Sequence, residues 1–186
     1  MNELLSRSGE LKKEATNLLE EYQLMSVFKR YGNPLIGGSF DLEVMTSRHF
    51  VVYIGSSALF EEHFFKLGKE IAVRLQPTKM VFINEQQKEE QLHWSVYTDV
   101  EGYEWKIDIS LVPTAIVQHR LQYQQRLKAK ITEEKKARIL LFKQQSGYNR
   151  YYKSEHVYEA VLEDDVKDDM SFFVWLQQCK KRDLSL

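Results

Sequence analysis

The sequence is poor in cysteine and proline, with one Cys and three Pro among 186 residues. Cys179 alone cannot build a disulfide framework or a cysteine zinc site. No apolar run approaches the roughly 20 residues that a helix needs to cross a bilayer. Acidic residues within the first dozen positions argue against a signal peptide. We therefore expect a cytoplasmic protein.

Neither sign of charge dominates, because 26 Lys and Arg face 27 Asp and Glu, for a formal net charge of -1. A chain without an overall field has no general attraction for nucleic acid or membranes, so we predict neither as a partner. The chain is instead rich in core-forming residues, with 43% hydrophobic and 12% aromatic side chains. This composition is typical of a folded domain rather than of a disordered chain.

Apolar periodicity and breaker residues divide the chain into alternating helices and strands. The first helix is predicted over 3–31, with an apolar face of Leu11, Ala15, Leu18, Tyr22 and Met25. A strand at 49–54, a helix from Ser56 to Leu75 with Phe60, Phe64, Leu67 and Ile71 on its apolar face, a strand at 79–84 and a solvated loop at 85–91 follow. Later helices are predicted at 115–145, 154–163 and 168–179, with Ser154 and Asp168 as N-caps of the last two.

Two alternating runs at 92–100 and 103–112 predict a β-hairpin with Glu101-Gly102 as its turn. A two-residue turn places Ser95 opposite Asp108 and Tyr97 opposite Lys106. One face of this hairpin is then polar. It carries His93, Ser95, Tyr97, Lys106, Asp108 and Ser110.

The order of elements predicts an α/β (α+β) fold, a mixed sheet with flanking helices and a helical C-terminal region. We divide the chain into an α/β domain at 1–114, which includes the helix 3–31, and a helical region at 115–186.

Several motifs in this order resemble the nucleotidyltransferase fold of the polymerase-beta-like superfamily, and in particular its small bacterial members with a helical tail. Gly38-Ser39 matches the family's Gly-Ser turn, and "FDLEVM" matches the short apolar helix that follows it. "EWKIDI" matches the strand that carries the family's third acid, at Asp108. "RILLFK" (138–143) and 154–176 resemble the tail of the same proteins.

The resemblance implies a site at Asp108, the one retained catalytic acid, with Gly38, Ser39, His49 and Lys106 contacting the ligand. In the family, an acid-x-acid pair holds two Mg²⁺ ions that neutralise the triphosphate. Counting from Gly38-Ser39, that pair falls on positions 49 and 51, which are His49 and Val51 here. Mg²⁺ requires anionic oxygen ligands, so we expect no metal site. If a metal binds at all, His49 and Asp108 are its ligands.

The sequence favours a degenerate nucleotidyltransferase-like protein that binds a nucleotide, another anion or a partner protein without catalysis. The alternative is an active nucleotidyltransferase with an altered metal site, which would use Mg²⁺ to move a nucleoside monophosphate onto a small molecule, protein or RNA. A second alternative is a non-catalytic interaction protein that forms a homodimer through its N-terminal helix.

Other candidate residues have simpler interpretations. Asp41 and Glu43 form an acid-x-acid pair, but the spacing favours a solvated or capping role over metal binding. The basic stretch 118–143, which includes Lys143, is interpreted as a solvated helix, and "GYNRYY" (147–152) as a cluster that docks the tail. The histidines outside position 49 show no ligand spacing. They are His63, His93, His119 and His156.

Overall fold

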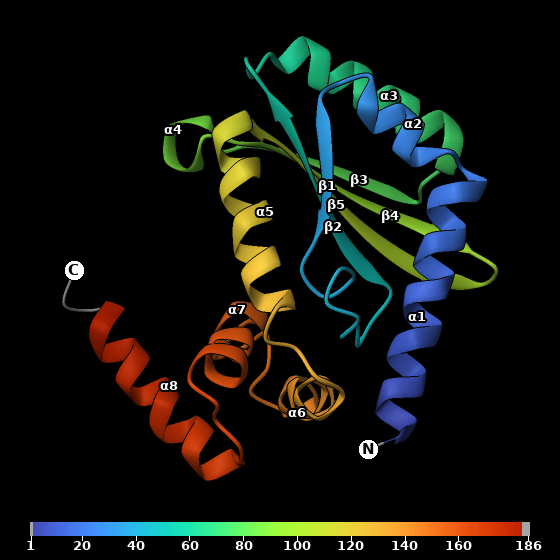
Figure 1. Cartoon of the computed structure of the whole chain (residues 1–186). Coiled ribbons are helices and arrows are strands. Elements are labelled where there is room, and N and C mark those ends of the chain that lie inside the picture. The colour runs from blue at the N-terminus through green and yellow to red at the C-terminus, as the bar shows by residue number, and fades with distance from the viewer. Residues whose placement is uncertain (1, 184–186) are drawn as a thin grey trace.

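A computed structural model describes residues 2–183 of the chain (Figure 1). A five-stranded mixed sheet lies between helices on both faces, and a group of helices follows at one end, which confirms the predicted fold class. No helix among the described residues has the length and hydropathy to cross a membrane. In chain order the elements are α1 (Asn2–Glu21), α2 (Leu24–Lys29), β1 (Asn33–Gly37), β2 (His49–Ser56), α3 (Glu61–Leu75), β3 (Lys79–Asn84), α4 (Gln86–Glu89), β4 (Leu92–Val100), β5 (Tyr103–Pro113), α5 (Thr114–Lys128), α6 (Glu133–Gln144), α7 (Ser154–Tyr158), the π-helical turn η1 (Glu159–Glu163) and α8 (Asp169–Asp183).

The strands have the spatial order β1-β2-β5-β4-β3, with β2 and β5 parallel at the centre and the other neighbours antiparallel. The predicted hairpin between β4 and β5 is confirmed. Glu101 and Gly102 have φ values of 53° and 80°, as a type I′ turn requires. The predicted register is also confirmed, because Ser95 pairs with Asp108.

Successive side chains of a strand point to opposite faces, so the sheet has one apolar and one polar face. Phe50, Val52 and Ile107 belong to the apolar face, which packs with α1, α2 and α3 into one hydrophobic cluster. In Figure 1 these three helices lie on one side of the sheet and α5 lies on the other. Helix α5 crosses closely at Gly55, where an added Cβ atom would lie 3.1 Å from Val117.

A second hydrophobic cluster joins α6, α7, η1 and α8. Leu42 and Val44, from the segment between β1 and β2, belong to this cluster although they precede most of the sheet in sequence. The segment that follows Gly38 is therefore anchored in the C-terminal helices. The domain boundary at 114/115 stays a prediction.

Two long predicted helices were wrong because each is interrupted. Gln23 has a left-handed backbone (φ 50°) and separates α1 from α2 within the predicted helix 3–31. The predicted helix 115–145 ends at Lys128 and resumes at Glu133 as α6, where the Thr132 hydroxyl accepts a hydrogen bond from the backbone N–H of Lys135. Helix propensity and charge pattern did not distinguish one long helix from two shorter helices joined by a turn.

Smaller corrections concern helix ends and loops. Helix α3 begins at Glu61, so Phe60 is exposed rather than part of the buried face, whereas Phe64, Leu67, Ile71 and Leu75 are buried. The predicted loop 85–91 contains the short helix α4. The predicted cap Asp168 is confirmed, since its Oδ1 accepts from the backbone N–H of Ser171 at 2.9 Å. Ser154 is not a cap but the first residue of α7, whose N-cap is Lys153.

Candidate functional site

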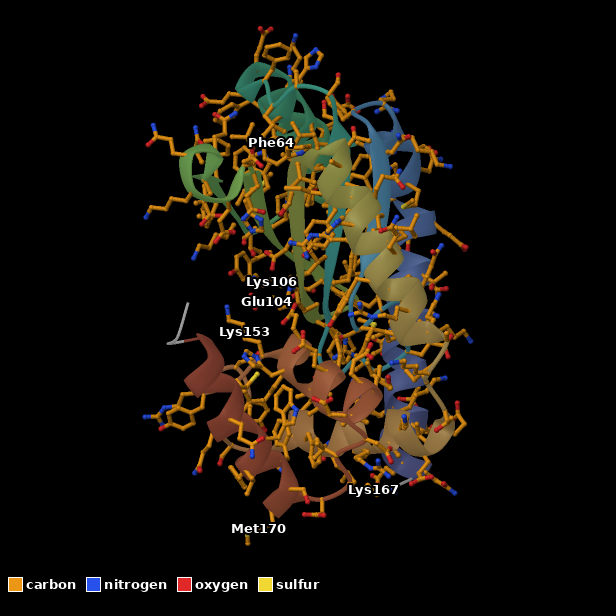
Figure 2. The ribbon with its side chains drawn as sticks, turned by 60° about the vertical axis from the view of Figure 1, so that its left-hand side comes forward. Phe64, Glu104, Lys106, Lys153, Lys167 and Met170 are labelled. Atoms are coloured by element: carbon orange, nitrogen blue, oxygen red, sulfur yellow. The ribbon has the colours of Figure 1, made fainter. Side chains whose placement is uncertain are left out.

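A cavity of about 900 Å³ lies between the polar face of the sheet and the C-terminal helices. Its lining comes from β2 and β5, from the segment after β1, from α5 and α6, and from the start of α7. In Figure 2, Glu104 and Lys106 lie at the end of the sheet on one side of the opening, and Lys153 lies on the other side. The predicted ligand contacts Gly38, Ser39, His49 and Lys106 all line this cavity, while Asp108 lies next to it through its hydrogen bonds.

The parallel pairing of β2 and β5 brings His49 and Asp108 together. His49 pairs with Lys106 in the register, and Val51 pairs with Asp108. His49 Nε2 and Lys106 Nζ each lie 2.8 Å from Asp108 Oδ2. The sequence pattern predicted that Lys106 and Asp108 share one face of the sheet, and the pairing of β2 with β5 adds His49 to it.

The other carboxylate oxygen of Asp108 is held by the neighbouring strand. Ser95 Oγ donates to Asp108 Oδ1 at 2.6 Å, and His93 Nε2 lies 3.3 Å from the same oxygen. His93 Nδ1 lies 3.0 Å from Ser110 Oγ, which fixes the orientation of the imidazole ring. The sequence pattern placed His93 on this face. Its contact with Asp108 was not predicted, because His93 has no metal-ligand spacing to another residue.

These partners decide the charge of Asp108, whose side chain is only 11% exposed. Burial opposes ionisation, but hydrogen bonds from His49, His93, Lys106 and Ser95 outweigh it and hold the pKa of Asp108 well below its usual range. Asp108 is therefore an anion whose charge is balanced by side chains of the same sheet. We name the set of His49, His93, Ser95, Lys106 and Asp108 the Asp108 cluster.

The residues of the Asp108 cluster do not suit a pair of Mg²⁺ ions. Mg²⁺ takes carboxylate, carbonyl and water oxygens in an octahedron, whereas the residues beside Asp108 on β2 are an imidazole and a valine. Both oxygens of Asp108 already accept hydrogen bonds. In the part of the chain whose side chains are described, no three or more His, Cys, Asp or Glu are grouped so that they could hold a metal ion.

The Gly38-Ser39 turn forms the second part of the site. Gly38 has φ 64°, a left-handed conformation that favours glycine. The backbone N–H of Leu42 bonds to the carbonyl of Gly38 at 3.0 Å, and that of Val44 to the carbonyl of Ser39 at 2.9 Å. The predicted helical segment 39–45 is thus a series of turns whose position is set by these bonds and by the burial of Leu42 and Val44.

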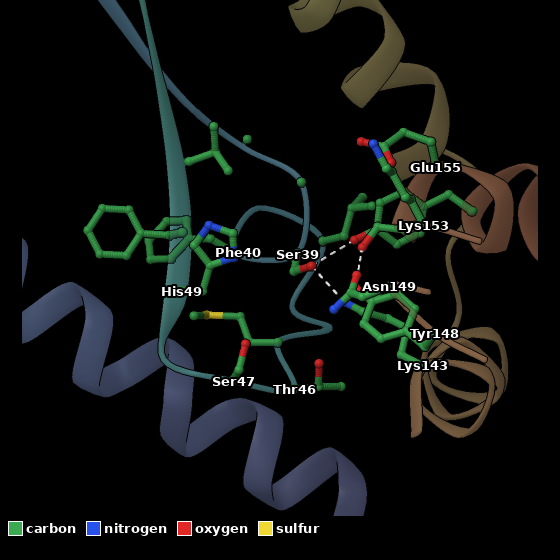
Figure 3. Close-up of a pocket in the computed structure, with 18 of the residues that line it drawn as sticks. Ser39, Phe40, Thr46, Ser47, His49, Lys143, Tyr148, Asn149, Lys153 and Glu155 are labelled. Atoms are coloured by element: carbon green, nitrogen blue, oxygen red, sulfur yellow. Dashed lines mark hydrogen bonds between the residues drawn. The ribbon is translucent and has the colours of Figure 1, made fainter. Parts of the chain in front are cut away.

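Ser39 meets two residues of the C-terminal helices that the sequence did not single out. Its Oγ lies 2.8 Å from the hydroxyl of Tyr158 and accepts a hydrogen bond from Lys143 Nζ at 2.7 Å (Figure 3). Lys143 also donates to the carbonyl of Val44 at 2.8 Å. We name Ser39, Lys143 and Tyr158 the Lys143 wall.

Lys143 was predicted to be solvated, and this was wrong, because only 4% of its surface is exposed. Burial lowers the pKa of Lys143 to about 7, and the charge of Glu155 opposes this shift only weakly. Within the described residues Lys143 forms no ion pair with a carboxylate, and its two acceptors are neutral oxygens. The only sequence signal was its spacing in the helix, which places it on a face with Ile139 and next to Phe142, both of which are buried.

Asp41 and Glu43, for which the sequence favoured a solvated or capping role, form ion pairs with helices instead. Asp41 Oδ1 accepts from Lys128 Nζ at 2.6 Å. Glu43 binds Lys12 at 2.7 Å and Lys136 at 2.8 Å, and these hydrogen bonds lower its pKa to about 2. Both acids tie the segment after Ser39 to helices and lie outside the lining of the cavity.

The cavity as a whole has more basic than acidic lining side chains. The acids in its lining are Glu104 and Glu155. The basic side chains, besides His49, are Arg7, Arg48, Arg120, Lys106, Lys143 and Lys153. Such an excess in a concave site favours an anionic ligand.

Comparison with solved structures gives the fold a name. The Cid1 poly(U) polymerase with bound MgGTP matches with a TM-score of 0.59 and 16% identity, over 82% of this chain and 50% of that chain. A cytoplasmic RNA terminal U-transferase matches with a TM-score of 0.56 and 14% identity, over 87% of this chain and 53% of that chain. This likeness shows that the chain has the nucleotidyltransferase fold and spans about half the length of these neighbours.

The predicted nucleotidyltransferase-like fold is thereby confirmed. No family model matches the chain, and no curated protein matches it. The narrower resemblance to small bacterial members stays a prediction.

Proposed function

We propose that this chain is a nucleotidyltransferase-fold protein that binds a nucleotide in its cavity without metal and without transferring it. The observation that carries the proposal is the contrast between two charges in one cavity. The carboxylate of Asp108 is paired with Lys106 and hydrogen-bonded to His49, whereas the buried ammonium of Lys143 has no carboxylate partner in the described chain.

A phosphate group is the ligand chemistry that matches the Lys143 wall. A buried ammonium without a counter-charge is costly, and an anion beside it restores the charge balance. The free N–H position of Lys143, the Ser39 hydroxyl and the cations on the opposite wall converge on one space. Neighbouring solved structures of the same fold bind MgGTP and MgATP, which supports a nucleoside triphosphate as the ligand.

The loss of transfer chemistry follows from positions 49 and 51. Nucleotidyl transfer in this fold depends on metal ions that neutralise the phosphates and orient the attacking oxygen. Lys106 places positive charge at Asp108 directly, and His49 adds a ring nitrogen, so the cluster carries basic side chains where acids would gather metal. Fixed cations attract a triphosphate but do not activate an acceptor hydroxyl.

The test is nucleotide binding with and without metal. We expect ATP, GTP, CTP or UTP to raise the melting temperature equally with Mg²⁺ and with excess chelator. At a nucleotide concentration a hundred times Kd, binding should add about 2.7 kcal/mol to the free energy of unfolding. Lys143→Met should abolish the shift, while Lys66→Met, on an exposed lysine of α3, should leave it unchanged.

A shift that requires metal would instead support the active enzyme. Asp108→Ala then becomes decisive, because an enzyme would lose its turnover while a metal-free binder has none to lose. If none of the four nucleotides raises the melting temperature, the proposal is contradicted. An interaction protein would then be the better interpretation, although the apolar residues Leu11, Ala15 and Leu18 of the N-terminal helix are buried within the chain itself.

A further inference from the structure

Helix α5 carries two buried polar atoms that lack a partner. Among the side chains that the structure describes, only the Tyr123 hydroxyl and the Gln124 Oε1 atom are buried N or O atoms without a hydrogen bond. Both residues line the cavity. Buried polar atoms are almost always paired, so two orphans on adjacent residues beside a cavity indicate a partner that comes from outside the chain.

The amide of Gln124 is held in one orientation. Its Nε2 donates to the carbonyl of Ile36 at 3.5 Å and to Asp41 Oδ2 at 3.3 Å. Asp41 is itself fixed by Lys128 at 2.6 Å. Because both acceptors lie on the nitrogen side, Oε1 is the free atom, and it can only accept a hydrogen bond.

The hydroxyl of Tyr123 is neutral at physiological pH. Burial, followed by the negative charges of Glu159 and Glu155, raises the pKa of Tyr123 to about 12. The hydroxyl therefore keeps its proton and can donate one hydrogen bond as well as accept. Tyr123 and Gln124 together offer a donor and an acceptor, which is a neutral pattern unlike the cationic Lys143 wall.

The amide of Gln124 lies beside the strand end that leads into the Gly38-Ser39 turn. The backbone of Gly37 passes so close to Gln124 that an added Cβ atom would lie 3.4 Å from Nε2. Also lining the cavity, one helical turn away, is Arg120, whose guanidinium lies 4.0 Å from the centre of the Tyr53 ring. The guanidinium of Arg120 therefore stacks on an aromatic ring at the same cavity, on the helix that carries the donor and acceptor.

We propose that Tyr123 and Gln124 recognise the nucleoside part of the ligand, as a subsite separate from the phosphate contacts of the Lys143 wall. Gln124 Oε1 accepts from an N–H or O–H of the nucleoside, and the Tyr123 hydroxyl donates to one of its oxygen or nitrogen acceptors. The inference rests on the proposed function, since it assigns the non-phosphate half of the same ligand. It makes these two residues the determinants of selectivity for nucleotides over plain phosphates.

The experiment compares a nucleoside triphosphate with inorganic triphosphate, both without metal, by calorimetry on the full chain. We expect the unaltered protein to bind the nucleotide more tightly. Tyr123→Phe and Gln124→Met should each weaken nucleotide binding about tenfold, the effect of one lost hydrogen bond, and leave the affinity for triphosphate unchanged. A 2′-deoxynucleotide distinguishes a sugar hydroxyl from a base edge as the group that is read.

The melting temperature of the ligand-free protein tests whether Tyr123 has a structural role instead of a binding role. Without ligand, Tyr123→Phe should keep or raise the melting temperature, because it removes a hydroxyl that has no partner. The matched control is Tyr152→Phe, which deletes a hydroxyl that donates to the carbonyl of Phe142 at 2.6 Å. This control should lower the melting temperature and leave both affinities as they were.

Three results would overturn the inference. One is an equal loss of affinity for nucleotide and triphosphate in Tyr123→Phe, and another is no loss for either variant. A third is a lower melting temperature of ligand-free Tyr123→Phe, which would show that the hydroxyl already has a partner. If the unaltered protein binds triphosphate but gains nothing from the nucleoside, only this inference fails. If it binds neither ligand, the proposed function fails as well.

Discussion

The two walls of the cavity treat charge in opposite ways. In the Asp108 cluster, one carboxylate meets His49, His93 and Lys106, so the charges on the sheet side are balanced within the protein. In the Lys143 wall, one buried ammonium donates to the oxygens of Ser39 and Val44 and lies near the Tyr148 and Tyr158 rings, without a carboxylate partner in the described chain. Both sites lie against the same 900 Å³ space.

The difference indicates at which wall an anion would bind more favourably. A ligand at the Asp108 cluster would compete with existing ion pairs, whereas a ligand at the Lys143 wall would supply a missing counter-charge. Under the proposed function, the concave site is kept while basic side chains stand where acids gather metal in related chemistry. The predictions that follow test each wall alone and then the turn that joins them.

The largest expected effect on stability comes from opening the Asp108 cluster. Asp108→Asn leaves three basic side chains without their anion and should lower the free energy of unfolding by about 2 kcal/mol, reduced from the usual 3–5 because the cations are partly exposed. Urea unfolding at pH 7 measures it. Because the folded-state pKa of Asp108 is depressed, this stabilisation is complete above its unfolded pKa and fades as pH falls below about 4.

The control for this prediction is Glu62→Gln, which removes an exposed carboxylate that pairs with Lys66 on α3. It should change stability by less than about 0.5 kcal/mol. Equal effects of the two variants would mean that the Asp108 cluster is no more than a surface ion pair.

The Lys143 wall should show itself as a dependence of stability on pH. The pKa of Lys143 is about 7 in the folded chain, below its unfolded value, so the folded state binds fewer protons between those two values. Stability should therefore rise with pH above 7, with a slope of up to about 1.4 kcal/mol per pH unit. Lys143→Met should flatten this slope when thermal unfolding is followed from pH 7 to 9.5. An unchanged slope would show that Lys143 is charged and solvated.

The smallest expected effect concerns the turn between the walls. Gly38→Ala places a Cβ atom in a left-handed conformation (φ 64°) with open space around it, so strain alone should cost about 1 kcal/mol. Gly9→Ala is the matched control, because Gly9 lies within α1 and also has open space. It should stabilise the protein by roughly 0.5–1 kcal/mol. Chemical denaturation of both variants checks the opposite signs.

Local pattern predicted the sheet better than the helices. Alternation and a two-residue turn were enough to set the pairing of Ser95 with Asp108, because a hairpin register follows from neighbours in sequence. The break at Ala129–Thr132 was missed, because the charged residues on either side are equally good helix formers. The burial of Lys143 was missed for a related reason. A lysine on a basic helix is expected to be solvated, and only the packing of other elements against that helix shows that it is buried.

The sequence by itself determined the class of fold, the polar face of the hairpin and the residues at positions 49 and 51, because these depend on periodicity and spacing along one stretch of chain. Only the tertiary structure decided which groups meet. Ser39 and Lys143 are separated by 104 positions in sequence yet form a hydrogen bond of 2.7 Å. The unpartnered atoms of Tyr123 and Gln124 became visible only once α5 was packed. Burial and long-range contact set charge and hydrogen bonding, and neither is written in local sequence.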